Sequence, residues 1–185
     1  MDEIEQRAES VLADVPDWLW NGETLPVPVD DIADTCFGLL IREVEDMASA
    51  PGAPELAPGQ SISGLLLAGP GEIWVNAAEA REWPPRRRFT IGHELGHWVM
   101  HRQPGQQSLF CRHGSVDPEQ KTDLPPERLS VEQEANVFAA ALTMPAHLIR
   151  QHYERLKRVD ECHARMCELF AASGAAMGRR LHAVI

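Results

Sequence analysis

Residues 89–97 read Phe-Thr-Ile-Gly-His-Glu-Leu-Gly-His, and this stretch decides how the rest of the chain is interpreted. Its apolar residues recur with the period of an α-helix. Pro84-Pro85 come before it, as is typical of a first helical turn, and Pro104-Gly105 follow it as a stop signal. The sequence therefore predicts one helix that begins at this proline pair and runs to Arg102.

This helix has two different faces when it is drawn as a wheel of about 100° per residue. The face expected to pack against a sheet is apolar and comprises Ile91, Leu95, Trp98 and Val99. The other face is polar and comprises Thr90, His93, Glu94 and His97. The two histidines are one turn apart, so both imidazoles can meet one metal ion. Gly92 and Gly96 are poor helix formers, which indicates that a backbone or ligand approaches the helix closely.

The motif His-Glu-x-x-His, with its glutamate placed to reach a metal-bound water, is typical of zinc peptidases. Such a site needs a third protein ligand and keeps a fourth position for water. Glu132 is the best candidate, in a helix expected to begin at Ser130 with a capping box to Gln133. Asn136 could hydrogen-bond a ligating histidine, and Glu134 is the reserve ligand. The alternative is that both acids are solvated residues at a helix start.

Several further residues are weaker candidates. His101 is expected to contact a ligand or to pack, because three ligands on successive turns of one helix do not converge easily on a tetrahedral ion, and direct ligation by His101 is the alternative. Cys111 is either a buried thiol, an additional metal ligand or a nucleophile, since Arg112 and His113 follow it and could lower its pKa. Those two side chains and Tyr153 are candidates for stabilising an oxyanion.

Composition narrows the function classes. The 185 residues suffice for one domain, and a hydrophobic fraction of 44% is that of a globular protein. A net charge of −11 would repel a phosphate backbone, so nucleic-acid binding is not expected. The basic cluster Arg86–Arg88 is expected to be salt-bridged or solvated. The acidic N-terminus, the short apolar runs and four cysteines without a Cys-x-x-Cys pair predict a cytoplasmic protein with no membrane contact and free thiols.

The remaining elements predict an α+β fold. Helices are expected over residues 2–20, 29–40 and 146–185, the last with a break at Ser173-Gly174. Strands are expected over residues 40–44, 63–68 and 72–76, and the last two form a hairpin around Gly69-Pro70-Gly71. Residues 48–60 are expected to be a loop, and residues 103–129 a surface segment with few helix or strand signals.

Two segments resemble a known family. Phe89 to His97 and the later run Glu132 to Ala140, followed by Met144-Pro145, are similar to the ImmA/IrrE metallo-endopeptidases. The likeness extends over roughly residues 25–182. It implies a gluzincin-like site with two histidine ligands, a glutamate ligand that aligns with Glu132, and Glu94 as catalytic base.

The resemblance also implies a fold and a function. We expect a zincin-like domain over residues 1–145, with an N-terminal helix within residues 1–24 and a small twisted sheet packed on the active-site helix. Residues 146–185 are expected to form a short helical C-terminal element packed on that domain. The resemblance implies one Zn²⁺ ion per chain and an enzyme that hydrolyses a protein substrate. The leading candidate substrate is a helix-turn-helix repressor of a stress, phage or mobile-element response. The alternatives are a zinc-containing scaffold without turnover and a toxin-like partner in a two-gene system.

Overall fold

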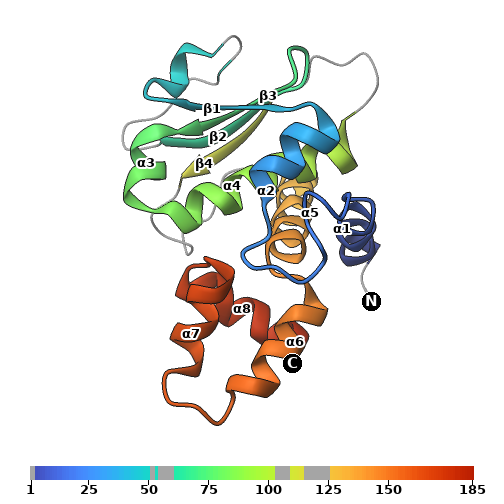
Figure 1. The fold of residues 1–185 in the computed structure, drawn as a ribbon. Coiled ribbons are helices and arrows are strands. Elements are labelled where there is room, and N and C mark those ends of the chain that lie inside the picture. The colour runs from blue at the N-terminus through green and yellow to red at the C-terminus, as the bar shows by residue number, and fades with distance from the viewer. Residues whose placement is uncertain (1–2, 51–52, 54–60, 103–108, 115–125) are drawn as a thin grey trace.

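The computed structural model describes residues 3–50, 53, 61–102, 109–114 and 126–185, with the backbone alone described for 109–114 and 126–129 (Figure 1). A small sheet lies over helix α4, helix α5 passes on the other side of α4, and three short helices follow α5. The α+β, zincin-like class expected from the sequence is therefore confirmed. Within the described residues, no helix is both long and apolar enough to cross a membrane.

The described sheet has four strands in the order β1-β3-β2-β4. Their bounds are β1 Leu40–Val44, β2 Ser61–Leu67, β3 Glu72–Asn76 and β4 Leu109–Gly114. The β2–β3 hairpin forms as predicted, β4 pairs antiparallel with the other side of β2, and β1 pairs parallel with β3. Strand β2 is buried on both faces after its first residue, which explains its continuous apolar run.

Strand β4 corrects the prediction for residues 103–129, which included no strand. Its sequence, Leu-Phe-Cys-Arg-His-Gly, lacks the alternation of a half-buried strand and contains no β-branched residue. Its place is set by backbone pairing with β2, including an irregular register between Ile62 and Gly64. Pairing of this kind depends on partners 42 to 53 residues away, from Leu67↔Leu109 to Ser61↔Gly114, and leaves little trace in the local pattern.

The helices differ from the prediction mainly at their ends. They are α1 Glu3–Ala13, α2 Val29–Asp31, α3 Ala77–Glu82, α4 Pro84–Gly96, α5 Pro126–Thr143, α6 Ala146–Leu156, α7 Cys162–Phe170 and α8 Gly174–Val184. Short π-helical turns, η1 Ile32–Cys36 and η3 His97–His101, extend α2 and α4, and a 3₁₀ turn, η2 Met47–Ser49, follows β1.

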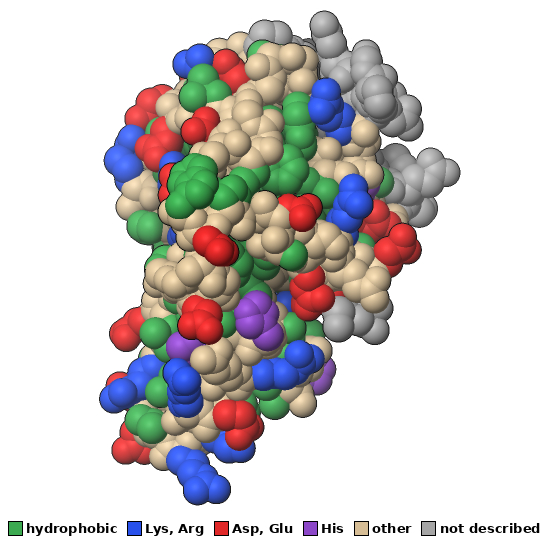
Figure 2. Space-filling model, turned by 45° about the vertical axis from the view of Figure 1, so that its right-hand side comes forward, with side chains coloured by type: hydrophobic (Ala, Val, Ile, Leu, Met, Phe, Trp, Pro, Cys, Tyr) green, Lys and Arg blue, Asp and Glu red, His purple; other side chains and the backbone are tan. Residues whose placement is uncertain are grey.

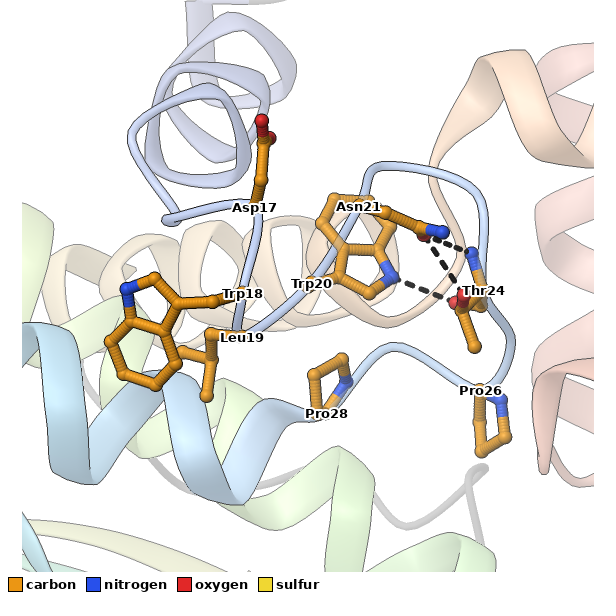
Figure 3. Close-up of a pocket in the computed structure, with 8 residues that line it drawn as sticks. All are labelled: Asp17, Trp18, Leu19, Trp20, Asn21, Thr24, Pro26 and Pro28. Atoms are coloured by element: carbon orange, nitrogen blue, oxygen red, sulfur yellow. Dashed lines mark hydrogen bonds between the residues drawn. The ribbon is translucent and has the colours of Figure 1, made fainter.

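Three of these differences have a local cause. α1 ends before Pro16, and the segment that follows, to Pro28, contains one backbone turn at Pro16 and side-chain hydrogen bonds of Asn21 and Trp20 (Figure 3). The helix expected to reach residue 40 stops at Cys36, because Gly38 adopts a positive φ of 66° that admits β1. α5 begins four residues before Ser130, so the predicted capping box is wrong.

The run Arg86–Arg88 forms salt bridges and hydrogen bonds, as expected from the sequence. Its partners are Glu79 and Ser63 for Arg86, Asp30 and Glu43 for Arg87, and the carbonyl oxygen of Val27 for Arg88. The three side chains thereby connect the first turn of α4 to α3, to the sheet and to the segment around α2. This basic run serves to fix the start of the helix that carries the histidines.

Helices α4 and α5 pack closely because glycines of α4 face α5. A Cβ atom added to Gly92 would lie 3.4 Å from Thr143 and 3.5 Å from Ala139, an ordinary contact. A Cβ atom added to Gly96 would lie only 3.0 Å from the ring of Phe138, which is fully buried. The close approach expected from these two glycines is therefore made by α5.

These two glycines predict opposite effects of one substitution. Gly92→Ala should raise the free energy of unfolding by up to about 1 kcal/mol, because it gains helix propensity without a clash. Gly96→Ala gains the same propensity but must displace Phe138, and overpacking of a core typically costs about 1–3 kcal/mol. Urea denaturation of both variants measures the difference. Equal stabilisation by the two substitutions would contradict this packing.

A buried ion pair joins the first and last helices. Arg180 in α8 is 5% exposed and pairs with both carboxylate oxygens of Glu5 in α1, while its Nε donates to the carbonyl oxygen of Met144 at 2.8 Å. The guanidinium thus also satisfies a backbone acceptor just after α5. One side chain holds three helices that are distant in sequence.

Removal of this guanidinium should destabilise the fold strongly. Arg180→Met leaves Glu5 and the Met144 carbonyl group without their buried donor, and breaking such a pair costs about 3 kcal/mol or more. The exposed neighbour Arg179 provides the control, since Arg179→Met should change stability by no more than about 0.5 kcal/mol. Thermal unfolding of both variants checks the difference, and similar melting temperatures would exclude a structural role for the pair.

Candidate metal centre

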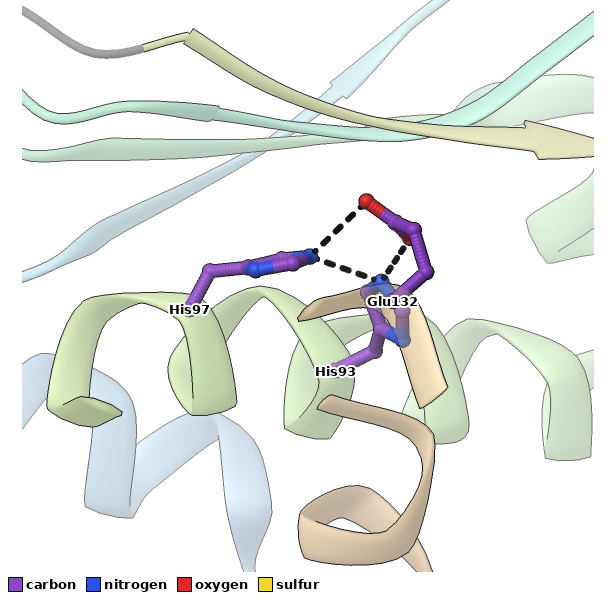
Figure 4. A group of neighbouring side chains, drawn as sticks. All are labelled: His93, His97 and Glu132. Carbon is purple, nitrogen blue, oxygen red and sulfur yellow. Dashed lines mark hydrogen bonds and ion pairs between the residues drawn. The ribbon is translucent and has the colours of Figure 1, made fainter. Parts of the chain in front are cut away.

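Three side chains from two helices converge between α4, its π-helical extension and α5. His93 and His97 are fully buried, and Glu132 reaches them from the second turn of α5 (Figure 4). The Nε2 atoms of the two histidines are 3.0 Å apart. The carboxylate of Glu132 places one oxygen 3.1 Å from Nε2 of His93 and the other 3.4 Å from Nε2 of His97. Ligand atoms of the three residues lie within 4.8 Å of one another, a group that could hold a metal ion.

The separations of these atoms match a small tetrahedral metal site. Ligands about 2.0–2.1 Å from a tetrahedral ion lie about 3.3 Å from each other. The two imidazole nitrogens are 3.0 Å apart, and the nearest Glu132 oxygens, a different one for each ring, are 3.1 Å from His93 and 3.4 Å from His97. Two imidazole nitrogens with one carboxylate oxygen form a donor set typical of catalytic zinc, with a fourth position left for water or substrate. The residues present therefore fit a zinc ion.

Asn136 orients the first histidine. Its Oδ1 lies 3.1 Å from Nδ1 of His93. A carbonyl oxygen only accepts hydrogen bonds, so Nδ1 of this histidine carries the proton and donates it. When this ring is neutral, as a metal ligand must be, the lone pair of Nε2 therefore faces Glu132 and His97. This is the contact expected for Asn136 from its position one turn after Glu132.

Glu132 is the charged member of the group. Burial raises the pKa of its carboxyl group, but hydrogen bonds and charge interactions with His93 and His97 lower this pKa well below the ordinary range. The carboxylate is therefore ionised at neutral pH. An ionised carboxylate between two imidazole nitrogens is the form that binds a divalent cation.

Glu94 lies between α4 and the central strand of the sheet. Its side chain is fully buried, and strand β2 passes over it at Gly64. A Cβ atom added to Gly64 would lie 2.8 Å from Oε1 of Glu94 and 2.3 Å from Cγ2 of Thr90. The missing side chain of Gly64 therefore makes room for the carboxylate of Glu94. This role of Gly64 was not predicted from the sequence, although an isolated glycine inside an apolar strand is a recognised sign of close approach.

His101 and Glu134 lie on the other side of His97. Nδ1 of His101 is 3.0 Å from Nδ1 of His97, the nitrogen that points away from Glu132. Nε2 of His101 is 2.9 Å from Oε2 of Glu134, whose side chain is 43% exposed. Neither residue belongs to the group around the two Nε2 atoms.

The other candidates do not join this group. Cys111 and His113 lie in β4, where the side chains are outside the described part of the structure. Tyr153 is in α6, beyond the end of α5 opposite to Glu132, and packs against the apolar core. The described free thiols are Cys36, Cys162 and Cys167.

A pocket in the segment between α1 and α2 lacks the chemistry of the metal centre. Its lining includes Trp18, Trp20 and Pro28, with Asp17 as its acidic member and no histidine or cysteine (Figure 3). The surrounding surface is mixed, because side chains of both charges are interspersed with apolar ones on the face that Figure 2 shows. The described residues that could jointly hold a metal ion are therefore His93, His97 and Glu132.

The comparisons with known proteins agree with this geometry. The family model of the IrrE N-terminal-like domain, Peptidase M78, matches residues 70–182. No curated protein matches the chain. The matched segment covers more than half of the chain and contains His93, Glu94, His97 and Glu132. The chain belongs to the peptidase family defined by the IrrE N-terminal-like domain.

Proposed function

We propose that this chain is a zinc-dependent endopeptidase. The proposal rests on one observation above all, the convergence of His93, His97 and Glu132 in a member of a metallopeptidase family. These three residues would bind one zinc ion, and Glu94 would act as general base. The donor set and the separations of its atoms support zinc over the oxygen-binding cations calcium and magnesium.

In the proposed mechanism the metal acts as a Lewis acid and a protein side chain acts as the general base. Zinc, when bound, supplies a Lewis acid that polarises a peptide carbonyl group and makes water a better nucleophile. Glu94 accepts the proton of the attacking water and returns it to the leaving amine. Its burial against Gly64 limits the orientations of the carboxylate and excludes competing water. Asn136 keeps His93 in the orientation and tautomer that a ligand requires.

Strand β4 supports a mode of substrate binding. It is the last strand of the sheet on the side of β2, and it passes above Glu132 in the view of Figure 4. Among the described strands, its outer edge has no neighbour. An edge of this kind pairs with an extended peptide through backbone hydrogen bonds. We propose that the substrate adds a strand at β4, with Arg112 or His113 of that strand as the donor that stabilises the oxyanion.

The proposed substrate is a protein, with a helix-turn-helix repressor encoded nearby as the leading candidate. This choice and its stress or mobile-element context derive from family likeness, whereas the cytoplasm as the proposed compartment derives from the acidic N-terminus, the short apolar runs and the cysteine spacing. The second function, a zinc-containing scaffold without turnover, predicts the same bound metal. Only the role of Glu94 separates the two functions.

Zinc binding should depend on Glu132 and much less on Glu134. Added zinc should raise the melting temperature of the unaltered chain, because a ligand that binds only the folded state stabilises it. Glu132→Gln removes the charged ligand, so zinc should then raise the melting temperature little. Glu134→Gln is the matched control, because its amide oxygen still accepts from His101. Metal content after dialysis gives a second readout, and a full zinc load in Glu132→Gln would refute this ligand set.

Turnover should depend on Glu94 without affecting the metal load. Glu94→Gln keeps the shape of the side chain but removes the base, so cleavage should slow by about 10² to 10⁴-fold while zinc content stays unchanged. Mass spectrometry of the neighbouring repressor, incubated with the zinc-loaded protein, measures cleavage. Glu82→Gln, an exposed change on α3, is the control. Cleavage that persists in Glu94→Gln would exclude this mechanism, and a full biological effect without any cleavage would favour the scaffold.

A further inference from the structure

We propose that His101 and Glu134 form a positioning pair that holds His97 in the tautomer required of a metal ligand. This inference rests on the proposed function, since it takes His97 as a ligand through Nε2. It assigns the two residues a role other than ligation. The pair acts through Nδ1 of His97, which His101 contacts, while Glu134 contacts Nε2 of His101.

A chain of hydrogen bonds leads from the protein surface to this ligand. Oε1 of Glu134 accepts a hydrogen bond from Oγ of Ser130 at 3.3 Å. Oε2 of Glu134 lies 2.9 Å from Nε2 of His101, and Nδ1 of His101 lies 3.0 Å from Nδ1 of His97. The His101 side chain is 11% exposed, so water competes little for its ring nitrogens.

The chemical nature of the last acceptor determines where each proton lies. The carboxylate of Glu134 only accepts, so Nε2 of His101 carries a proton and donates it. With its one proton on Nε2, the His101 imidazole offers Nδ1 as an acceptor. It can only receive the Nδ1–H of His97, which leaves the lone pair of His97 Nε2 directed towards Glu132. In the opposite tautomer, His97 would direct a proton at the position that a metal ion must occupy.

The π-helical turn explains how His101 reaches His97. Residues 97–101 form η3, where the backbone N–H of Arg102 donates to the carbonyl oxygen of His97 at 3.0 Å, five residues back. This wider turn sets the two imidazoles side by side, with ring centroids 5.1 Å apart and planes inclined by 53°. Single π-helical turns of this kind are frequent at functional sites.

The pair repeats on His97 what Asn136 does for His93. In both cases an oxygen atom from α5 is the final acceptor, and the proton on Nδ1 of the ligand points away from the metal centre. α5 thus supplies one ligand, Glu132, and an acceptor for each of the two histidines. Such outer contacts orient ligands, and their loss typically weakens metal affinity about 10- to 100-fold.

Substitutions of His101 test the pair through its two nitrogen atoms separately. His101→Asn places an amide oxygen where Nδ1 was, so it still accepts from His97. His101→Gln places its amide group near the former Nε2 and reaches Glu134 only. His101→Phe keeps the ring and loses both contacts. The exposed substitution His182→Phe on α8 is the matched control.

The measurements are the zinc dissociation constant, by competition with a chromophoric chelator, and the visible absorption of the Co²⁺-substituted protein. We expect His101→Phe and His101→Gln to weaken zinc binding about 10- to 100-fold and to change the cobalt spectrum. His101→Asn should retain affinity and spectrum close to those of the unaltered chain. Glu134→Leu should weaken binding in the same direction, and adding it to His101→Phe should cause no further loss, because the residues act as a unit.

The results distinguish this inference from the proposed function. If the unaltered chain binds no zinc, the zinc-peptidase proposal fails and the pair has no ligand to position. If the unaltered chain binds zinc, and a folded His101→Phe binds it equally well with the same cobalt spectrum, the positioning role alone is overturned. If His101→Phe does not fold, the exposed position of Glu134 makes Glu134→Leu decisive, and unchanged zinc affinity in that variant overturns the pair.

Discussion

The close packing of α4 on α5 is the constraint on which the rest of the structure depends. Gly92 and Gly96 remove the side chains that would keep the two helices apart, and Phe138 and Ala139 occupy the space. At this separation a carboxylate from the second turn of α5 reaches the imidazole of His93 in α4 and that of His97 in η3. The glycines disfavour the helix itself, so their presence in the histidine segment reflects the requirement of tertiary packing.

A second close approach, on the other side of α4, completes the arrangement. Strand β2 passes over Glu94 at Gly64, so the carboxylate is enclosed between the helix and the sheet. α4 is therefore buried on both of its faces, which a helix wheel with one apolar and one polar face does not suggest. Its polar face packs against polar groups of α5 and is not exposed to solvent. This burial strengthens the electrostatic contacts made there.

The sequence predicted those parts of the site that depend on helical periodicity. The spacing of His93 and His97, and of Glu132 and Asn136, places each pair on one helix face, and the structure brings these four side chains together. Gly64 and strand β4 were missed because their roles arise from contacts between distant segments. The link from His101 to Glu134 was also missed. It requires a π-helical turn, and local sequence patterns do not distinguish such a turn from the α-helix that it extends.

The ion pair between Glu5 and Arg180 has a consequence for the order in which the molecule forms. The two residues are 175 positions apart, so the contact cannot exist until the last helix has left the ribosome. Before that moment α1 lacks its partner from α8, and the carbonyl group of Met144 lacks its buried donor. A nascent chain can therefore assemble the sheet, α4 and α5 early, whereas the ion pair between α1 and α8 forms later. Synthesis itself thus sets a time before which α1 and the end of α5 are not joined through Arg180.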